Sequence, residues 1–286
     1  MTEQVFLTET PRDGFQGIKK NIPTEIKVAY INKLLECGFD TVETGSFVSK
    51  RIIPQMADTE EVLRRINRKN TQTKIAVLTA TVKGGEKACR FEKVDKIFFP
   101  FSTSPHFLKR NINQTLEQAE RTIDHLLELA FKHQKELVVY FSWAFGNPYG
   151  DPWNTDILIR AIKQIQKKGL SFFPLSDIDG NASPEKIFNV FSTLYRSLDQ
   201  ITLGLHLHSL PEESYAKIHA AYRAGVRHFD TVNGGLGGCP MTGKEMISNT
   251  DTGTIIRHFK NSGIQTGINE KCLQQAADIL HSSGLF

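Results

Sequence analysis

The chain has 286 residues and carries 35 Lys plus Arg against 31 Asp plus Glu, which is a formal net charge of +4. This near balance of charge excludes a strongly basic nucleic-acid-binding protein. Hydrophobic residues make up 40% of the chain and charged residues 23%, so the chain can bury a sizeable core and is not dominated by disorder. We expect a folded, soluble protein.

Nothing in the sequence points to a membrane or to an oxidising compartment. No stretch approaches the roughly 18 unbroken apolar residues that a membrane helix needs. Residues 1–9 show no basic segment followed by an apolar run, so we expect no targeting leader. The cysteines are scattered without CxxC spacing, at Cys37, Cys89, Cys239 and Cys272. We therefore expect a cytoplasmic protein with no membrane partner.

Short apolar runs alternate with longer amphipathic segments along the whole chain. Eight runs have the character of strands: 5–9, 41–44, 74–79, 96–101, 137–142, 171–177, 202–208 and 227–231. Helical patterns are found at 24–37, 115–133, 155–168, 183–198, 212–224 and 270–281. Thr24 is the candidate N-cap of the first of these helices, and Gly38 follows its end.

This alternation predicts a (β/α)8 TIM barrel, because each interval between strands is long enough for a parallel crossover. A doubly wound open sheet is the alternative fold. No Pro/Gly/Ser-rich linker or charge run divides the chain, so we expect one domain over residues 1–286. The helix at 270–281 lies beyond the eighth unit as a C-terminal extra helix. It could cover the barrel as a lid or contact a partner.

In such a barrel, chemistry belongs at the carboxyl ends of the strands. The seventh run ends in His206-Leu207-His208. Because residues two apart on a strand point to the same side, both imidazoles can face one point, as two ligands of one metal would. Two polar residues at a strand end, without a ligand role, are an equally good interpretation of this pair alone.

Charged residues follow the first two strands. Arg12 and Asp13 come directly after the first run, where a carboxylate could bind a metal and a guanidinium could stabilise an enolate. The two residues could instead form a surface ion pair. Glu43, at the end of the second run, could orient Arg12 or hold a metal-bound water, or it could form a structural salt bridge.

After the eighth run comes a glycine-rich segment, 233–238, that ends at Cys239. Such a segment is suited to a mobile loop that closes over a site and excludes water. A thiol at the tip of a loop is unusual as packing, since buried cysteines mostly lie within apolar elements. We therefore favour a chemical role for Cys239 as an acid or a nucleophile.

Together these motifs resemble the 3-hydroxy-3-methylglutaryl-CoA lyase family. The resemblance runs from the first strand to the last helix and rests on these stretches: 11–14 (PRDG), 42–49 (VETGSFVS), 54–56 (PQM), His206 with His208, and 235–240 (GLGGCP). It implies a metal-dependent carbon–carbon lyase on a TIM barrel carrying Mg2+ or Mn2+. Such an enzyme cleaves a hydroxyacyl-CoA thioester, its small-molecule partner and substrate, to acetyl-CoA and acetoacetate by retro-Claisen chemistry.

The resemblance also implies roles for individual residues. The metal ligands would be Asp13, His206, His208 and Asn249. Arg12 would stabilise the enolate, Glu43 would be the acidic residue near the metal, and Cys239 would help to protonate the product. Asp177 matches an active-site aspartate. Gln16 and Lys20 match positions near the acyl-CoA.

This sequence departs from the family pattern at several points. Ser209-Leu210 follow the second histidine, where the family has Asp-Thr, and the segment from Cys239 to Asn249 is one residue longer. Ile178-Asp179 stand in place of Thr-Ile after Asp177, and Asn147 stands where many members carry cysteine. These differences concern substrate fit more than the metal ligands, so the acyl group could differ from hydroxymethylglutaryl.

Two other functions are considered. One is a Claisen-type synthase of the same barrel group that condenses an acyl-CoA with a 2-oxo acid. The other is a metal-binding homologue without catalysis. No basic stripe or stacking platform indicates a nucleic-acid partner. Barrels of this kind often dimerise, and we expect a homodimer.

Overall fold

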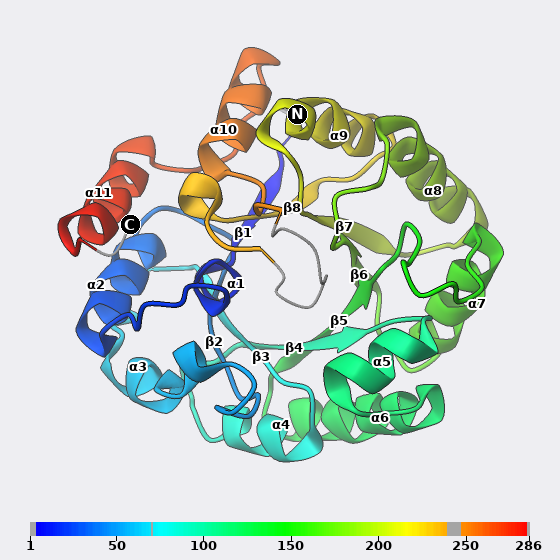
Figure 1. Cartoon of the computed structure of the whole chain (residues 1–286), viewed down its shortest axis with the longest axis horizontal. Helices are drawn as coiled ribbons and strands as arrows, with labels where there is room; N and C mark the ends of the chain where they lie inside the picture. Colours follow the sequence, from blue (N-terminus) through cyan, green and yellow to red (C-terminus); the bar gives the residue numbers. More distant parts are fainter. Residues whose placement is uncertain (1–3, 70, 239–246, 285–286) are drawn as a thin grey trace.

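The computed structural model describes residues 4–69, 71–238 and 247–284. Eight parallel strands pair in chain order, and β1 pairs with β8 to close the barrel (Figure 1). The strands are β1 (Phe6–Glu9), β2 (Thr41–Ser46), β3 (Lys74–Leu78), β4 (Lys96–Phe101), β5 (Glu136–Ser142), β6 (Phe172–Asp177), β7 (Thr202–Leu207) and β8 (His228–Thr231). The closed barrel confirms the predicted (β/α)8 fold and rules out the open sheet.

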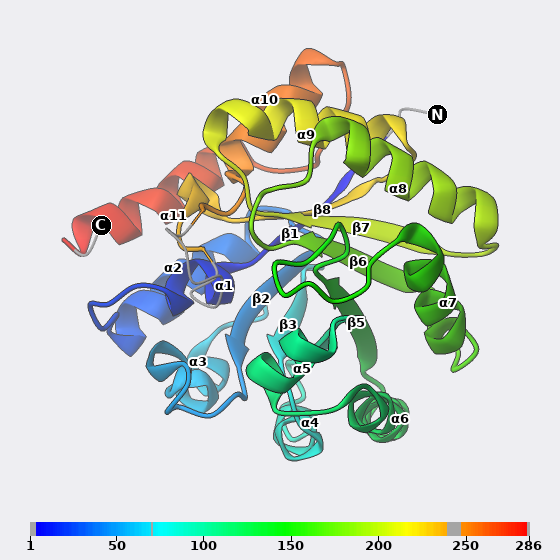
Figure 2. The ribbon, with the colours of Figure 1, turned by 45° about the vertical axis from the view of Figure 1, so that its right-hand side comes forward.

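Helices surround the barrel (Figures 1 and 2). The α-helices are α1 (Pro11–Gln16), α2 (Thr24–Leu35), α3 (Thr59–Arg65), α4 (Val82–Cys89), α5 (Pro105–Ile112), α6 (Leu116–Lys132), α7 (Thr155–Gln166), α8 (Pro184–Ser197), α9 (Pro211–Arg223), α10 (Thr252–Asn261) and α11 (Glu270–Ser282). The helices α1, α3, α4, α5 and α10 were not predicted. Each spans ten residues or fewer, too short for a clear helical period, and α1, α4 and α10 contain glycine.

The predicted N-cap of α2 is wrong. Thr24 is the first residue of the helix, after Pro23, and no side chain caps the helix start. The Thr24 hydroxyl instead donates to Asp58 at 2.7 Å, a contact that local sequence cannot reveal. Gly38, with φ of 92°, follows the helix where a Cβ would lie 2.6 Å from the carbonyl oxygen of Gly267. Glycine is therefore required there by the close approach of another chain segment.

Strand residues alternate between the inside of the barrel and the layer under the helices. Phe98 and Val138 form part of the small core inside the barrel, packed against Tyr140. Phe99 and Phe141, each next to one of these residues, belong to the larger core between strands and helices. Side chains at the upper end of the inner columns are thereby left facing the mouth of the barrel.

The last helix, α11, is not a lid. It packs against α2 on the outer ring of helices (Figures 1 and 2). The backbone N–H of Asn269, just before α11, donates to the carbonyl oxygen of Cys37 at 2.8 Å. This contact holds the start of α11 beside the end of α2, away from the barrel mouth. In the described part of the chain, no helix is long and apolar enough to cross a membrane.

Candidate active site

Three predicted ligands converge where β1 and β7 end. One ligand atom from each of Asp13, His206 and His208 lies within 4.8 Å of the other two, and all three residues are buried. The Nε2 atoms of the two imidazoles are 3.1 Å apart. The Oδ2 atom of Asp13 lies 3.8 Å from Nε2 of His206 and 3.7 Å from Nε2 of His208. The HxH pair therefore faces one point, together with the aspartate.

Helix α1 presents Asp13 because it begins directly after β1, with Pro11 at its first position, where a missing N–H costs nothing. A Cβ on Gly14 would lie 2.7 Å from the side chain of Val232, so α1 packs closely against the segment after β8. Asp13 Oδ1 accepts hydrogen bonds from Arg12 and Gln16. Its Oδ2 is buried and has no hydrogen-bond partner among the described residues.

Arg12 and Glu43 form a bidentate ion pair inside the site. Nε of Arg12 donates to Oε1 of Glu43 at 2.8 Å and Nη2 donates to Oε2 at 2.9 Å. Arg12 also pairs with Asp13 at 2.9 Å, and because both of these side chains are buried, the pair is not the surface ion pair of the alternative interpretation. Burial raises the pKa of Glu43 to about 7, although Arg12 acts in the opposite direction. The pair fixes the guanidinium at the edge of the cluster.

The electrostatics of the cluster favour an ionised Asp13 beside a neutral His208. Burial alone would raise the pKa of Asp13, but Arg12 and the two imidazoles outweigh it, so that pKa is lowered. Burial lowers the pKa of His208 to about 4. For His206, burial is outweighed by the carboxylates of Asp230 and Asp13, which raise its pKa.

These groups fit a divalent cation. The unpartnered Oδ2 of Asp13 is a buried acceptor aimed at two imidazole nitrogens, an arrangement that a cation satisfies and a hydrogen bond here does not. One carboxylate and two imidazoles are the ligand types of Mn2+ and related ions. Asn249 lies beside them, since it forms an isolated backbone bridge with His208 and its amide group helps to lower the pKa of Asp13.

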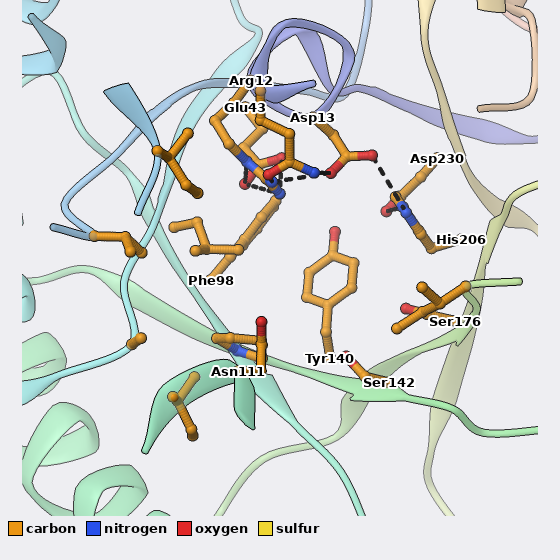
Figure 3. Close-up of a pocket in the computed structure, with 18 of the residues that line it drawn as sticks. Arg12, Asp13, Glu43, Phe98, Asn111, Tyr140, Ser142, Ser176, His206 and Asp230 are labelled. Atoms are coloured by element: carbon orange, nitrogen blue, oxygen red, sulfur yellow. Dashed lines mark hydrogen bonds and ion pairs between the residues drawn. The ribbon is translucent and has the colours of Figure 1, made fainter. Parts of the chain in front are cut away.

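The cluster forms one wall of a pocket at the barrel mouth (Figure 3). The facing walls are mainly apolar and come from the ends of β2 to β6 and from α5. The apolar lining residues are Val48, Ile52, Ile53, Leu78, Ala80, Phe98, Pro100, Phe107, Ile112 and Ile178. Among the described lining residues, Arg12 is the only Lys or Arg, and its guanidinium is already bonded to Glu43, Asp13 and Gln16.

Of the other predicted site residues, some line the pocket and others do not. Gln16 lines the pocket and bonds both Arg12 and Asp13. Lys20 is exposed, does not line the pocket, and donates to the carbonyl oxygen of Gly284 at 3.1 Å. Asp177 is buried outside the pocket lining, accepts from the N–H of Ala182, and has a pKa that burial raises to about 7. Cys239 lies outside the described residues.

Sequence reasoning missed five polar residues of the pocket: Asn111, Tyr140, Ser142, Ser176 and Asp230. Oδ2 of Asp230, near the end of β8, lies 3.1 Å from Nδ1 of His206. The position of Asp230 at a strand end was an available signal. Tyr140 could not be recognised locally, because an aromatic residue within a strand ordinarily indicates packing.

Fold and site together define a (β/α)8 barrel with an aspartate and two histidines clustered at the carboxyl ends of its strands. A model of the HMGL-like family matches residues 4–280. The chain therefore belongs to the HMGL-like family.

Its relatives include 3-hydroxy-3-methylglutaryl-CoA lyases. The mitochondrial hydroxymethylglutaryl-CoA lyase of Homo sapiens is 30% identical over 270 residues, which are 94% of this chain and 82% of the relative. The cytoplasmic 3-hydroxy-3-methylglutaryl-CoA lyase of Homo sapiens is 29% identical over 270 residues, 94% of this chain and 72% of the relative. Both mitochondrial and cytoplasmic proteins are thus among the relatives.

Solved structures of HMG-CoA lyases have the same fold as this chain. The HMG-CoA lyase of Brucella melitensis superposes with a TM-score of 0.89 at 28% identity and covers 98% of both chains. An HMG-CoA lyase of Acinetobacter baumannii, in complex with coenzyme A and 3-methylmalate, has a TM-score of 0.89 at 27% identity, covering 98% of this chain and 90% of that one.

Proposed function

We propose that this protein is a metal-dependent carbon–carbon lyase that cleaves 3-hydroxy-3-methylglutaryl-CoA, or a related hydroxyacyl-CoA, to acetyl-CoA and acetoacetate. The observation that carries the proposal is the convergence of Asp13, His206 and His208 beside the Arg12–Glu43 pair in one pocket. Family membership and the lyases among the relatives support the same reaction class.

Asp13, His206, His208 and Asn249 would hold the cation, with Mg2+ or Mn2+ as the candidates. A bound divalent cation would act as a Lewis acid that makes the substrate hydroxyl more acidic. The pocket residues bind and orient the thioester, and the apolar walls exclude water from the reacting carbons.

The cleavage itself is balanced without an external reactant. The hydroxyl passes its proton to His206, and the bond between the carbinol carbon and the carbon beside the thioester breaks. The electron pair of that bond becomes the enolate of acetyl-CoA, while the carbinol carbon becomes the ketone of acetoacetate. Arg12 stabilises the negative charge on the enolate oxygen, with Glu43 holding the guanidinium in place.

The enolate must then receive a proton at carbon. We assign this step to the Cys239 thiol, aided by His206. Gln16 and Lys20 are assigned to the acyl-CoA, and Asp177 to an acid–base role. A cytoplasmic homodimer with one domain over residues 1–286 also remains part of this proposal.

The test is release of acetoacetate and acetyl-CoA from hydroxymethylglutaryl-CoA by the purified, reduced protein. Reactions with Mn2+, with Mg2+ and with chelator are compared, and Asp13→Ala is the control variant. Release that requires the metal and Asp13 supports the proposal. Acetyl-CoA-dependent condensation of a 2-oxo acid would instead favour the synthase, and metal binding without turnover of any hydroxyacyl-CoA would overturn the catalytic assignment.

A further inference from the structure

Behind His206 lies a carboxylate that the proposed reaction does not use. Asp230, on the inner side of β8, is 7% exposed, and its Oδ2 lies 3.1 Å from Nδ1 of His206 (Figure 3). The opposite ring nitrogen of His206, Nε2, is the atom that faces Asp13 and His208. The imidazole is therefore held between two carboxylates, one on each side of the ring.

We propose that Asp230 is a positioning residue that keeps His206 in the tautomer with its proton on Nδ1. This inference rests on the proposed metal site. A neutral imidazole carries one N–H donor and one acceptor nitrogen, and a carboxylate oxygen accepts hydrogen bonds. A proton on Nδ1 therefore lets the ring donate to Asp230 across the 3.1 Å contact, and it leaves the lone pair of Nε2 directed at the cluster.

The proton of His208 is also kept on Nδ1, but by a different group. Its Nδ1 lies 3.2 Å from the carbonyl oxygen of Ile247, which also can only accept. Both imidazoles then direct unprotonated Nε2 atoms at each other across 3.1 Å, with the unpartnered Oδ2 of Asp13 nearby. Three acceptors that face one another repel, and a cation between them removes the repulsion. The two Nδ1 contacts thus prepare the site for a metal ion.

The partner of His206 differs from that of His208 in charge. A carboxylate on the far nitrogen makes an imidazole a more basic ligand than a carbonyl does, and loss of such a partner typically lowers metal affinity about 10-fold to 100-fold. The ring of Tyr140 packs against the imidazole of His206, with the ring centroids 6.1 Å apart and an angle of 84° between the ring planes, and helps to fix the plane of the imidazole. Asp230 would therefore fix the proton position, and the packed ring would fix the orientation.

Two variants of Asp230 separate the effect of its hydrogen bond on the tautomer from the effect of its negative charge. Asp230→Leu has nearly the same shape and no acceptor, so His206 loses its reason to keep the proton on Nδ1. Asp230→Asn removes the charge but retains an oxygen that can accept from Nδ1. Removing one member of a buried pair destabilises a fold, so folding of each variant is checked first by circular dichroism. Should Asp230→Leu not fold, Asp230→Ala takes its place.

The first readout is the tautomer, measured by nitrogen–proton NMR of the histidine rings in metal-free protein at about pH 8.5, where ordinary imidazoles are neutral. We expect the Nδ1–H form for His206 in the wild type and in Asp230→Asn, and the Nε2–H form in Asp230→Leu. His208, bonded to the backbone, should keep Nδ1–H in all three and serves as the internal control.

The second readout is the affinity for Mn2+, measured by electron paramagnetic resonance. We expect about 10-fold to 100-fold weaker binding in Asp230→Leu and a smaller loss in Asp230→Asn. The proposal is overturned if His206 keeps its tautomer in Asp230→Leu. It is also overturned if Asp230→Asn loses as much Mn2+ affinity as Asp230→Leu, because the negative charge alone would then explain the effect. Neither readout needs turnover, so failure of the proposed lyase activity would be a separate result.

Discussion

The pKa values of the buried carboxylates near the strand ends of this barrel depend on the groups that surround each carboxylate. Burial raises the pKa of Glu9 and of Glu43 to about 7, whereas the pKa of Asp13 is lowered. Asp13 has Arg12 and two imidazoles beside it, but the partners of Glu9 are neutral donors, namely the N–H of Asn233 and the hydroxyls of Thr231 and Thr252. Neutral donors reduce the cost of burying the charge without removing it.

Glu9 should therefore make the protein less stable as the pH rises. Its pKa in the folded state, about 7, lies above the ordinary value of 4.5, so its contribution is present below pH 4.5 and is lost as the pH rises to about 7. The shift corresponds to about 3 kcal/mol of unfolding free energy. We expect Glu9→Gln to lose correspondingly less stability than the wild type between about pH 5 and pH 8. Urea unfolding at both pH values measures this, and equal losses would contradict it.

The thiol of Cys239 belongs to the residues outside the described part, but the segment leading to it is placed. A Cβ on Gly237, with φ of 78°, would lie 2.6 Å from the carbonyl oxygen of Gly14 and 2.8 Å from that of Asp13. The segment therefore runs directly against α1, which carries Asp13. The proposed role of the thiol at the site is tested by substitution.

We expect Cys239→Ala to lower turnover of the cleaved thioester about 100-fold, as loss of a general acid does. Affinity for Mn2+ should stay within twofold of the wild type, because the thiol is not among the proposed ligands. Steady-state kinetics and metal titration of the same preparation measure both quantities. Unchanged turnover would remove the thiol from the mechanism.

At the scale of elements, α1 depends on a neighbouring motif. Gln55, in the short 3-10 helix Pro54–Met56, is 5% exposed. Its amide donates to the carbonyl oxygens of Ile18 and Lys20 and accepts from the N–H of Ile22. These bonds hold the segment between α1 and α2. The PQM stretch that carried part of the family resemblance thus acts on the element that bears Arg12 and Asp13.

Gln55→Leu should destabilise the protein by about 2 to 3 kcal/mol, since the buried N–H of Ile22 and two partly buried carbonyl oxygens lose their partner. The matched control is Gln72→Leu on an exposed residue, which should change stability by less than about 0.5 kcal/mol. Urea unfolding measures both variants. A loss in Gln55→Leu no greater than in the control would show that water replaces the side chain without cost.

At the scale of the whole molecule, the candidate ligands come from distant parts of the chain. Asp13 follows β1, the histidines end β7, and Asn249 precedes α10. Only closure of the barrel by pairing of β1 with β8 brings these segments together. Unfolding would therefore scatter the ligands, so a bound metal must stabilise the folded barrel as a unit.

Addition of Mn2+ at about 100 times its dissociation constant should raise the free energy of unfolding by about 2.7 kcal/mol. Chelator should reverse the effect, and Asp13→Ala should abolish it at the same Mn2+ concentration. Calorimetry or thermal unfolding with and without metal measures this. An equal stabilisation of the wild type and Asp13→Ala would mean that the ion binds elsewhere.

The pattern of the chain was enough to predict the barrel and its eight strands, because short strand-like runs, most of them apolar, alternate with longer amphipathic segments along the whole chain. The sequence also singled out Asp13, His206 and His208, since active-site residues of such barrels lie at the carboxyl ends of the strands. The short helices α1, α3, α4, α5 and α10 could not be predicted, because their stability comes from tertiary packing more than from a helical pattern in their own sequence.

Which side chains meet became known only from the folded barrel. Closure of the barrel placed Asp230 behind His206 and Tyr140 opposite the cluster, contacts between strands that no local pattern encodes. It also placed Asp177 outside the pocket lining and left Lys20 exposed, away from that lining. The physical reason is that periodicity reports which face of an element is buried, whereas the partner on that face depends on strand register and on the path of the loops.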